Sequence, residues 1–203
     1  KGVKPDLNGD QIKDIASHVR SLSGLATDSI RAQRGKELFA EACAACHGPD
    51  GKGTIGLAPN LTDKVWLYSS SEESIVETIT NGRTGVMPPM AEAVGTAQDV
   101  RNVAHYVLSL SGSPHNSAAA QLGKPKFAVC AACHGPDGKG MVALGAPNLT
   151  DKVWLHGWGE AAIVRTVTQG RQNVMPAQAS RLSPEQIRVL AAYVWNLSQG
   201  GKV

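Results

Sequence analysis

The segment CAACHGPDGKG at residues 43–53 occurs a second time, unchanged, at residues 130–140. Farther along the chain, APNLTDKVWL at 58–67 recurs at 146–155. The two blocks lie one residue farther apart in the second copy, so the sequence is a tandem duplication with a single insertion. Each copy contains a short helix ahead of the cysteines, a loop rich in Gly, Pro and Asn, and a closing amphipathic helix.

The closing helix is predicted three times, at 7–24, 94–112 and 182–200, because each stretch has apolar residues at helical spacing and ends at Gly. Ser183 and Gln186 form a capping-box pattern at the start of the third copy. We therefore expect two complete modules preceded by the tail of another. The predicted units are an orphan closing helix at 1–28, a first domain at 29–112, a short polar linker at 113–116 and a second domain at 117–203.

The four cysteines fall into two pairs with a two-residue gap, a spacing that alone fits disulfides, a zinc site, a redox dithiol or haem attachment. His47 and His134 directly follow the second Cys of each pair, which gives the CxxCH signature of c-type haem. Zinc needs four suitably spaced ligands, and a dithiol needs no following His. The sequence therefore predicts two covalently bound haem c groups with these histidines as proximal ligands. The thiols that attach them are Cys43, Cys46, Cys130 and Cys133.

A sixth iron ligand is predicted from the Met-Pro pairs in NGRTGVMPP and QGRQNVMPA. Met87 lies 40 residues after His47 and Met175 lies 41 after His134, and the difference is the insertion already found. Proline after each Met suits an extended loop that directs a thioether toward a metal. We expect the pairs His47 with Met87 and His134 with Met175. A Met is more often core filler than ligand, and Met90 is the reserve candidate in the first module.

Two further pairs of residues recur in the duplicated frame and are candidate haem contacts. Trp66 and Trp154 carry a ring N–H that needs a partner, which is typical of a cofactor pocket edge, although core packing would also explain them. Arg83 and Arg171 precede the Met residues by four positions, and a planar guanidinium suits a haem propionate. Exposure to solvent is the alternative for both arginines.

Other recurring residues are expected to be structural. The aromatic residues ahead of the cysteines, Phe39 and Phe127, should pack against the closing-helix residues Tyr106 and Tyr193. Met141 has no counterpart and is expected at the surface or in packing. The same holds for the remaining histidines, which are His18, His105, His115 and His156.

Composition sets limits on the class of protein. With 203 residues, 42% apolar, the chain is a soluble globular sequence, yet 4 Trp, 3 Tyr and 2 Phe are few for two packed cores, so another group is expected to fill the interior. The net charge of +3 is spread along the chain, which argues against a nucleic-acid partner. No apolar stretch has the length of a membrane span. A membrane anchor or signal peptide in the parent protein is expected before Lys1.

Both modules resemble class I cytochrome c domains, and the pair resembles the periplasmic part of the dihaem subunit of cbb3-type cytochrome oxidases. The resemblance covers residues 29–200 and is carried by CAACHGPDGKG, the APNLTDKVW blocks, NGR and QGR before VMP, and VLSLSG. It implies an all-α fold of two small helical bundles, each wrapped around a covalently bound haem. It also implies an N-terminal membrane anchor and a relay of electrons from soluble cytochromes toward the catalytic subunit.

The sequence departs from that family pattern at its start, where a third closing helix occupies the place of the anchor and linker. The Met-to-cap spacing of the two modules, applied to Asn8, predicts a Met just before Lys1 and a third CxxCH upstream, as in a trihaem version of the subunit. A linker helix with the same amphipathic pattern is the alternative.

Electron transfer by two low-spin haems is the leading functional hypothesis, and the chain is not expected to be an enzyme by itself because Met occupies the sixth iron position. A dihaem peroxidase or a haem-dependent thiosulfate dehydrogenase would need an open iron site. A soluble dihaem shuttle, or a donor domain fused to a reductase such as copper nitrite reductase, is a third reading. Expected partners are other c-type cytochromes, a membrane oxidase or a periplasmic copper reductase. Haem c is attached outside the bacterial cytoplasm, so the periplasm is the expected location.

Overall fold

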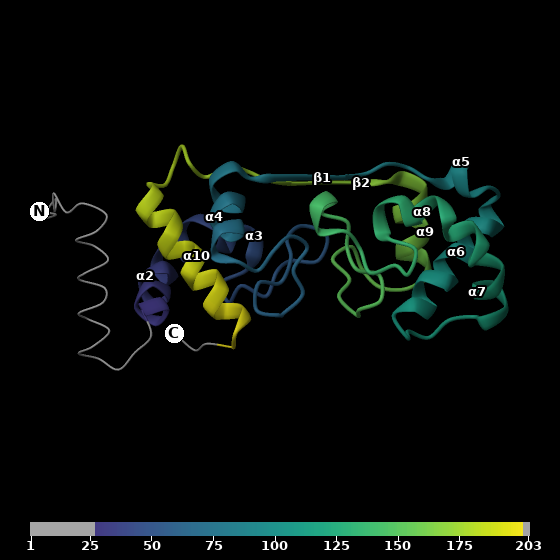
Figure 1. Cartoon of the computed structure of the whole chain (residues 1–203), viewed down its shortest axis with the longest axis horizontal. Helices are drawn as coiled ribbons and strands as arrows, with labels where there is room; N and C mark the ends of the chain where they lie inside the picture. The colour runs from purple at the N-terminus through teal and green to yellow at the C-terminus, as the bar shows by residue number, and fades with distance from the viewer. Residues whose placement is uncertain (1–26, 201–203) are drawn as a thin grey trace, which may run out of the picture.

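The protein has two helical lobes that lie side by side along the long axis of the molecule, as Figure 1 shows. The computed structural model describes residues 27–200, with side chains from residue 35 onward. The orphan helix predicted at 7–24 lies outside the described residues. The described part of the chain holds no helix that is both long and apolar enough to cross a lipid bilayer.

The secondary structure of residues 27–200 is mostly helical and includes one pair of strands. The elements are, in chain order, α2 (Thr27–Ala42), α3 (Ala44–His47), α4 (Glu72–Asn81), β1 (Arg83–Met87), α5 (Ala91–Val94), α6 (Ala97–Leu110), α7 (Ser117–Gly123), the short 3-10 helix η1 (Pro125–Phe127), α8 (Ala128–His134), η2 (Val142–Leu144), α9 (Glu160–Gln169), β2 (Arg171–Met175) and α10 (Pro184–Ser198). The expectation of an all-α fold is therefore incomplete, because β1 and β2 pair.

The first lobe is built from α2, α3 and α4 of the first repeat together with α10 of the second repeat. Its ranges are 27–82 and 176–198. Tyr193 on α10 packs against Phe39 on α2, with ring centroids 5.2 Å apart. At Gly35 the two helices approach so closely that a Cβ atom would lie 2.5 Å from the Cβ atom of Tyr193. The buried core of this lobe comprises Phe39, Ile75, Ile79, Ile187, Leu190, Ala191, Tyr193 and Val194.

The second lobe is one continuous stretch, residues 88–170, and contains α6 of the first repeat with α7, α8 and α9 of the second. Tyr106 on α6 packs against Phe127, again with ring centroids 5.2 Å apart. At Gly123 the backbone of α7 touches the backbone of α6 at Asn102, where no Cβ atom would fit. The buried core comprises Val94, Val100, Val103, Ala104, Val107, Leu108, Phe127, Cys130, Ile163 and Val167.

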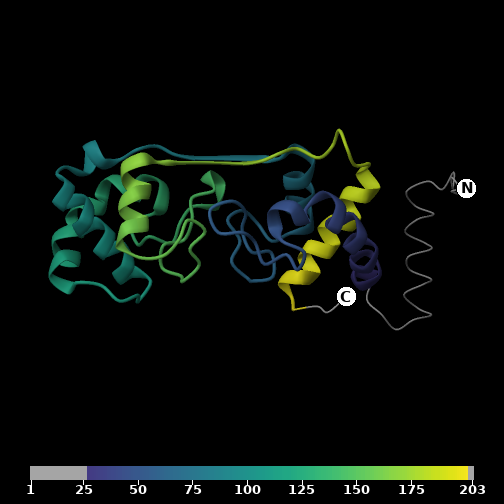
Figure 2. The same ribbon diagram turned by 180° about the vertical axis from the view of Figure 1, so that it is seen from behind.

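The two closing helices are thus exchanged between the repeats, and the paired strands carry the chain from one lobe to the other (Figures 1 and 2). β1 and β2 run antiparallel in the register Arg83↔Met175, Gly85↔Asn173 and Met87↔Arg171. Beyond the strands, the Met90 N–H donates to the Val167 carbonyl at 2.8 Å. This bond holds the continuation of β1 in the second lobe.

This arrangement differs from the domains predicted at 29–112 and 117–203, in which each repeat closes on itself. The predicted aromatic contacts form, but with exchanged partners. The predicted linker at 113–116 is a turn inside the second lobe, where Ser113 and Ser111 share a hydrogen bond of 2.8 Å between their hydroxyl groups. The physical reason is that both closing helices present similar apolar faces, so the extended path of β1 and β2 decides which partner each helix meets.

Helix caps form as the local sequence predicts. The Thr96 hydroxyl accepts the Asp99 N–H and the Asp99 carboxylate accepts the Thr96 N–H, which completes a capping box at the start of α6. Ser183 and Gln186 form the equivalent box on α10, with Pro184 in the first turn. The capped N-terminal N–H groups of both helices therefore find side-chain partners within three residues, whichever lobe the helix packs in.

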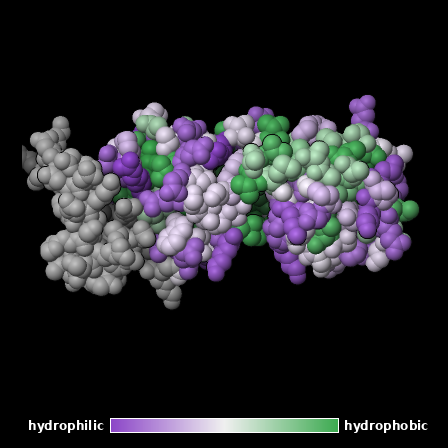
Figure 3. All heavy atoms as spheres, viewed as in Figure 1, coloured by the Kyte–Doolittle hydropathy of each residue, from purple (hydrophilic) through white to green (hydrophobic). Residues whose placement is uncertain are grey.

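The lobes meet through the loops that follow the two cysteine motifs. The Gly56 N–H donates to the Leu155 carbonyl at 2.6 Å. The Tyr68 hydroxyl lies against Gly145 so closely that a Cβ atom there would be 2.6 Å away. Figure 3 shows apolar residues gathered near the middle of the molecule, where the lobes adjoin. Several large apolar side chains of these loops are exposed, namely Ile55, Leu57, Val65, Leu67, Val142, Leu144 and Val153.

Candidate haem-attachment sites

Each cysteine motif ends a short helix at the inner side of its lobe. Cys43 precedes α3 and is half-buried, and Cys130 lies on α8 and is buried, whereas Cys46 and Cys133 are exposed. All four thiols are free, as attachment through thioether bonds requires. Burial raises the pKa of the Cys43 thiol to about 11, so this thiol stays neutral at physiological pH.

The two histidines of the motifs are held in the orientation that an iron ligand needs. His47 Nδ1 lies 3.0 Å from the Pro59 carbonyl oxygen, and His134 Nδ1 lies 3.0 Å from that of Pro147. A carbonyl only accepts, so Nδ1 carries the proton and Nε2 keeps its lone pair. Both side chains are buried, and burial lowers the pKa of His47, which favours the neutral ring that binds metals.

The prolines that orient the histidines were not singled out from the sequence. Pro59 and Pro147 lie in the repeated APNLTDKVWL block, and their recurrence after each CxxCH was the signal available. The backbone between motif and block folds back on itself, with the Leu61 N–H donating to the Gly51 carbonyl at 2.7 Å. The spacing from His to Pro is 12 residues in the first copy and 13 in the second, and both copies place a carbonyl oxygen opposite the imidazole.

Trp154 indicates independently that the second lobe can hold a cofactor with a hydrogen-bond acceptor. Its ring nitrogen Nε1 is buried and has no hydrogen-bond partner in the protein. A buried donor without a partner costs free energy, so such atoms usually serve a bound group. The indole packs against the core that contains Cys130, and Trp66 packs against the equivalent first-lobe core beside Cys43. The donor set therefore fits haem c.

The two predicted Met ligands lie at the ends of the paired strands. Both strands alternate between half-buried and exposed residues, and Met87 and Met175 point to the half-buried side. Met175 packs against the first-lobe core and Met87 against the second-lobe core. Met90 also packs in the second lobe, so its position alone does not separate it from Met87. Met141 is 38% exposed, as expected for a surface residue.

The two arginines each bind back to the preceding helix. Arg83 donates from Nε to the Thr78 hydroxyl at 2.9 Å, and its guanidinium lies 4.5 Å from the centre of the Tyr68 ring. Arg171 donates from Nε to the Thr166 hydroxyl at 3.0 Å. These bonds fix both side chains beside the strand ribbon. A role at a haem propionate stays a prediction.

The other histidines form structural contacts where they are described. His105 Nε2 lies 3.3 Å from the Glu160 carboxylate, and its Nδ1 accepts the Asn116 N–H at 3.2 Å. His156 Nε2 lies 3.0 Å from the Asn173 amide nitrogen, and burial and the nearby Arg171 lower the pKa of His156. His115 Nδ1 lies 2.8 Å from the Ser113 carbonyl oxygen. His18 lies outside the described residues.

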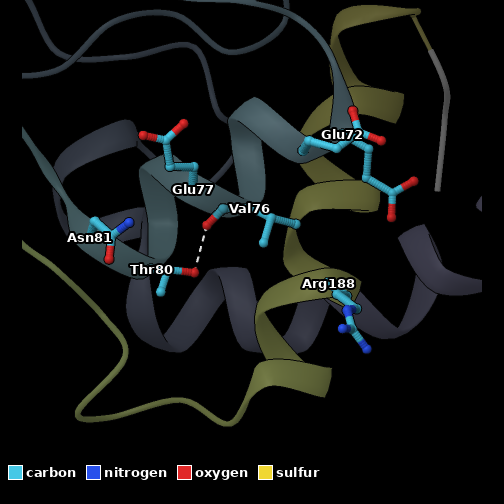
Figure 4. Close-up of a pocket in the computed structure, with 7 residues that line it drawn as sticks. Glu72, Val76, Glu77, Thr80, Asn81 and Arg188 are labelled. Carbon is cyan, nitrogen blue, oxygen red and sulfur yellow. Dashed lines mark hydrogen bonds between the residues drawn. The ribbon is translucent and has the colours of Figure 1, made fainter. Parts of the chain in front are cut away.

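A hollow of about 380 Å³ lies elsewhere, between α4 and α10 (Figure 4). Its walls include the carboxylates of Glu72, Glu73 and Glu77 and the guanidinium of Arg188. No cysteine, histidine or methionine lines it. This hollow is therefore separate from the candidate attachment sites.

Two CxxCH helices with oriented histidines and free thiols, set in small helical lobes, define a c-type cytochrome. Comparison with known families agrees with this class. The chain belongs to the family described as cytochrome c oxidase, cbb3-type, subunit III, which matches residues 31–107 and 119–194.

Individual relatives carry the same designation. The chain is 63% identical over 179 residues to the cbb3-type cytochrome c oxidase subunit CcoP of Rubrivivax gelatinosus, covering 88% of this chain and 59% of that protein. It is 44% identical to the subunit FixP of Azorhizobium caulinodans, covering 85% of this chain and 61% of the relative. For the FixP of Bradyrhizobium diazoefficiens the identity is 43%, covering 97% and 71%. The chain thus spans about 60% of the length of the first two relatives.

Proposed function

We propose that this chain carries two haem c groups, each with one His and one Met ligand, and relays electrons within a cbb3-type oxidase. The observation that carries the proposal is the pair of buried histidines, His47 and His134, each with Nδ1 on a carbonyl oxygen and Nε2 left for iron. The family membership and the names of the relatives support the oxidase as the setting.

The residues of the chain have distinct tasks in this proposal. Two thiols in each motif anchor the porphyrin edge, and the adjacent imidazole is locked by its carbonyl partner before any electron arrives. Met87 and Met175 would each supply a thioether ligand to an iron, and thioether ligation would favour a relatively high reduction potential. When bound, haem supplies a centre that takes up and releases one electron without gaining or losing a ligand.

The location and partners follow from the same proposal. Because haem c is attached outside the bacterial cytoplasm, the chain would work in the periplasm, and a membrane anchor in the parent protein would hold it beside the oxidase. Electrons would arrive from other c-type cytochromes and leave toward the catalytic subunit. The comparisons name oxidase subunits and lend no support to a copper reductase as partner.

The test begins with the haem content and ligation of the purified holoprotein. A pyridine haemochrome assay should give two haems per chain, and replacing Cys43 and Cys46 by Ala should leave one. The oxidised protein should show the weak sulfur-to-iron absorption band near the red end of the spectrum. Stopped-flow mixing should show reduction by a soluble c-type cytochrome and reoxidation by the oxidase with oxygen present.

The competing enzymatic reading makes the opposite prediction about open iron positions. With both sixth positions filled by Met, the reduced protein should bind carbon monoxide only slowly at neutral pH and show no peroxidase turnover. Rapid carbon monoxide binding would indicate a vacant or weakly held position and would contradict the proposed relay.

A further inference from the structure

We infer that the two Met ligands are exchanged between the haems, an inference that rests on the proposed His/Met ligation. Met175 of the second repeat ligates the haem attached at Cys43 and Cys46 in the first lobe. Met87 of the first repeat ligates the haem attached in the second lobe. Each haem site would then combine a proximal His from one repeat with a distal Met from the other.

The first observation is the packing of the two side chains. Met175 packs against the core cluster that also contacts Cys43 and Ala44, which lie at the start of the first attachment helix. Met87 packs against the cluster that contains Cys130 and contacts Val129. Each thioether is therefore in contact with the core beside the attachment motif of the other repeat.

The second observation is the extended path of β1. Arg83, at its start, is tied to the first lobe by the Thr78 hydroxyl and the Tyr68 ring. Met87 lies four positions after Arg83 in the extended strand, which corresponds to about 13 Å along its axis. This distance exceeds the length of a Met side chain, so β1 carries the Met87 thioether out of the first lobe.

The third observation is that a backbone hydrogen bond fixes the chain just past the end of each strand. Past β1, the Met90 N–H donates to Val167 on α9 at 2.8 Å, and past β2, the Gln178 N–H donates to Ile79 on α4 at 2.9 Å. A Cβ atom at Gly170 would lie 2.5 Å from the Met87 carbonyl oxygen, so the helix end and the Met loop are in contact there. The exchanged position of each Met loop is thus held by bonds outside the strands.

The proposed pairing does not exchange the other cofactor contacts. Arg171 faces Met87 across the ribbon, and Arg171 and Trp154 belong to the same repeat as the second attachment motif. Only the Met ligand and the closing helix of each repeat are contributed to the lobe that holds the other repeat's attachment motif. Each lobe therefore keeps its own Trp and Arg beside its haem and receives the Met from the other repeat.

The test uses full-length protein with one attachment motif removed. In the variant carrying Cys130→Ala and Cys133→Ala, one haem remains on the first motif. Adding Met175→Ala should abolish the near-red band of this remaining haem and produce a high-spin electron paramagnetic resonance signal. Adding Met87→Ala instead should keep the near-red band and produce no high-spin signal. Met141→Ala, at an exposed Met that packs against neither core, is the control.

The reciprocal set removes Cys43 and Cys46 and should give the reverse dependence on the two Met residues. Loss of the first-motif band on Met87→Ala, with Met175→Ala silent, would overturn the exchange while leaving His/Met ligation intact. Absence of the band from the unsubstituted dihaem protein would instead contradict the proposed function itself. The two failures are therefore distinguishable.

A second measurement does not need a haem-free lobe. A protease site inserted in the turn at 113–116 allows the intact dihaem protein to be cut after folding. With exchanged helices and ligands, the two fragments should remain together during native size-exclusion chromatography and keep both near-red bands. Separation into two monohaem fragments that each retain the band would show that each repeat is complete alone and would refute the exchange.

Discussion

Tyr193 lies against Phe39, with their ring centroids 5.2 Å apart, although the two residues come from opposite ends of the described chain. The contact sits where α10 crosses α2, beside Gly35. It means that the core around the first attachment motif is completed by the last helix of the chain. Stability of the first lobe therefore depends on residues of the second repeat, and this dependence can be measured.

Replacing Leu190 by Ala should destabilise the first lobe, because this α10 side chain is 0% exposed in that lobe's core. Truncating a buried Leu costs about 2–5 kcal/mol. Hydrogen exchange followed by mass spectrometry should show the loss of protection in α2 and α4. Val103→Ala on α6 is the matched control and should affect α7 and α9. Loss of protection confined to the second lobe in Leu190→Ala would contradict the observed helix exchange.

Gly123→Ala should lower stability by about 1–3 kcal/mol, because an added Cβ atom would collide with the α6 backbone at Asn102. Gly35→Ala tests the equivalent crossing of α2 with α10. The midpoint of urea unfolding measures both. Gly85→Ala is the control, since nothing lies within 4 Å of a Cβ atom there. Equal urea midpoints for all three variants would show that the close approach of the helices does not contribute to the free energy of unfolding.

Asp151→Asn should raise stability at neutral pH. Burial raises the pKa of Asp151, and the nearby Asp63 carboxylate raises it further. The folded state therefore holds this proton more tightly than the unfolded chain, so stability is higher below the unfolded pKa and falls as pH rises through the folded pKa. Asn still accepts the Val153 N–H, which Asp151 accepts at 2.9 Å.

Urea unfolding across a pH series measures this effect, and the gain from Asp151→Asn should vanish at acidic pH. Asp137→Asn provides a control of opposite sign, because Lys139 lowers the pKa of Asp137. That carboxylate stabilises the fold above its unfolded pKa, so its replacement should cost stability at neutral pH. A gain for Asp151→Asn that is independent of pH would rule out the proposed electrostatic cause.

Trp154→Phe should lower the reduction potential of the haem at the second motif. The buried Nε1 of Trp154 lacks a protein partner, and an N–H donated to a propionate offsets negative charge that favours the ferric state. We expect a shift of about 59 mV or less, the value of a tenfold change for one electron. Spectroelectrochemical titration measures it, with Trp66→Phe as the repeat-matched control. An unchanged potential would leave Trp154 as a packing residue.

The features on which the attachment prediction rests are local in the sequence. CxxCH places both thiols and the imidazole within five consecutive residues, and the caps at Thr96 and Ser183 depend on side chains three positions away. The carbonyl partners of the histidines are also close in sequence. Pro59 is 12 residues from His47, in the next repeated block of the same copy. Such features are fixed by spacing and need no knowledge of the tertiary fold.

The exchange of closing helices could not be predicted in the same way. Tyr106 and Tyr193 occupy equivalent positions on helices with similar apolar faces, so either helix fits against Phe39 or Phe127. Which partner each helix meets depends on the five residues 83–87 or 171–175 ahead of it, which can either turn back or pair as a strand. RTGVM and RQNVM carry no proline or turn motif that would settle this, and the pairing of β1 with β2 is a long-range contact.

The second lobe is formed by one continuous stretch, residues 88–170, so the two lobes are expected to fold at different times. During synthesis, which starts at the N-terminus, all segments of the second lobe appear in one continuous stretch. The apolar face of α2 is covered only after α10, the last described helix, has been made. Contacts between distant segments form slowly because a long loop must close first. The second lobe can therefore fold first, and the core around the first attachment motif is completed last.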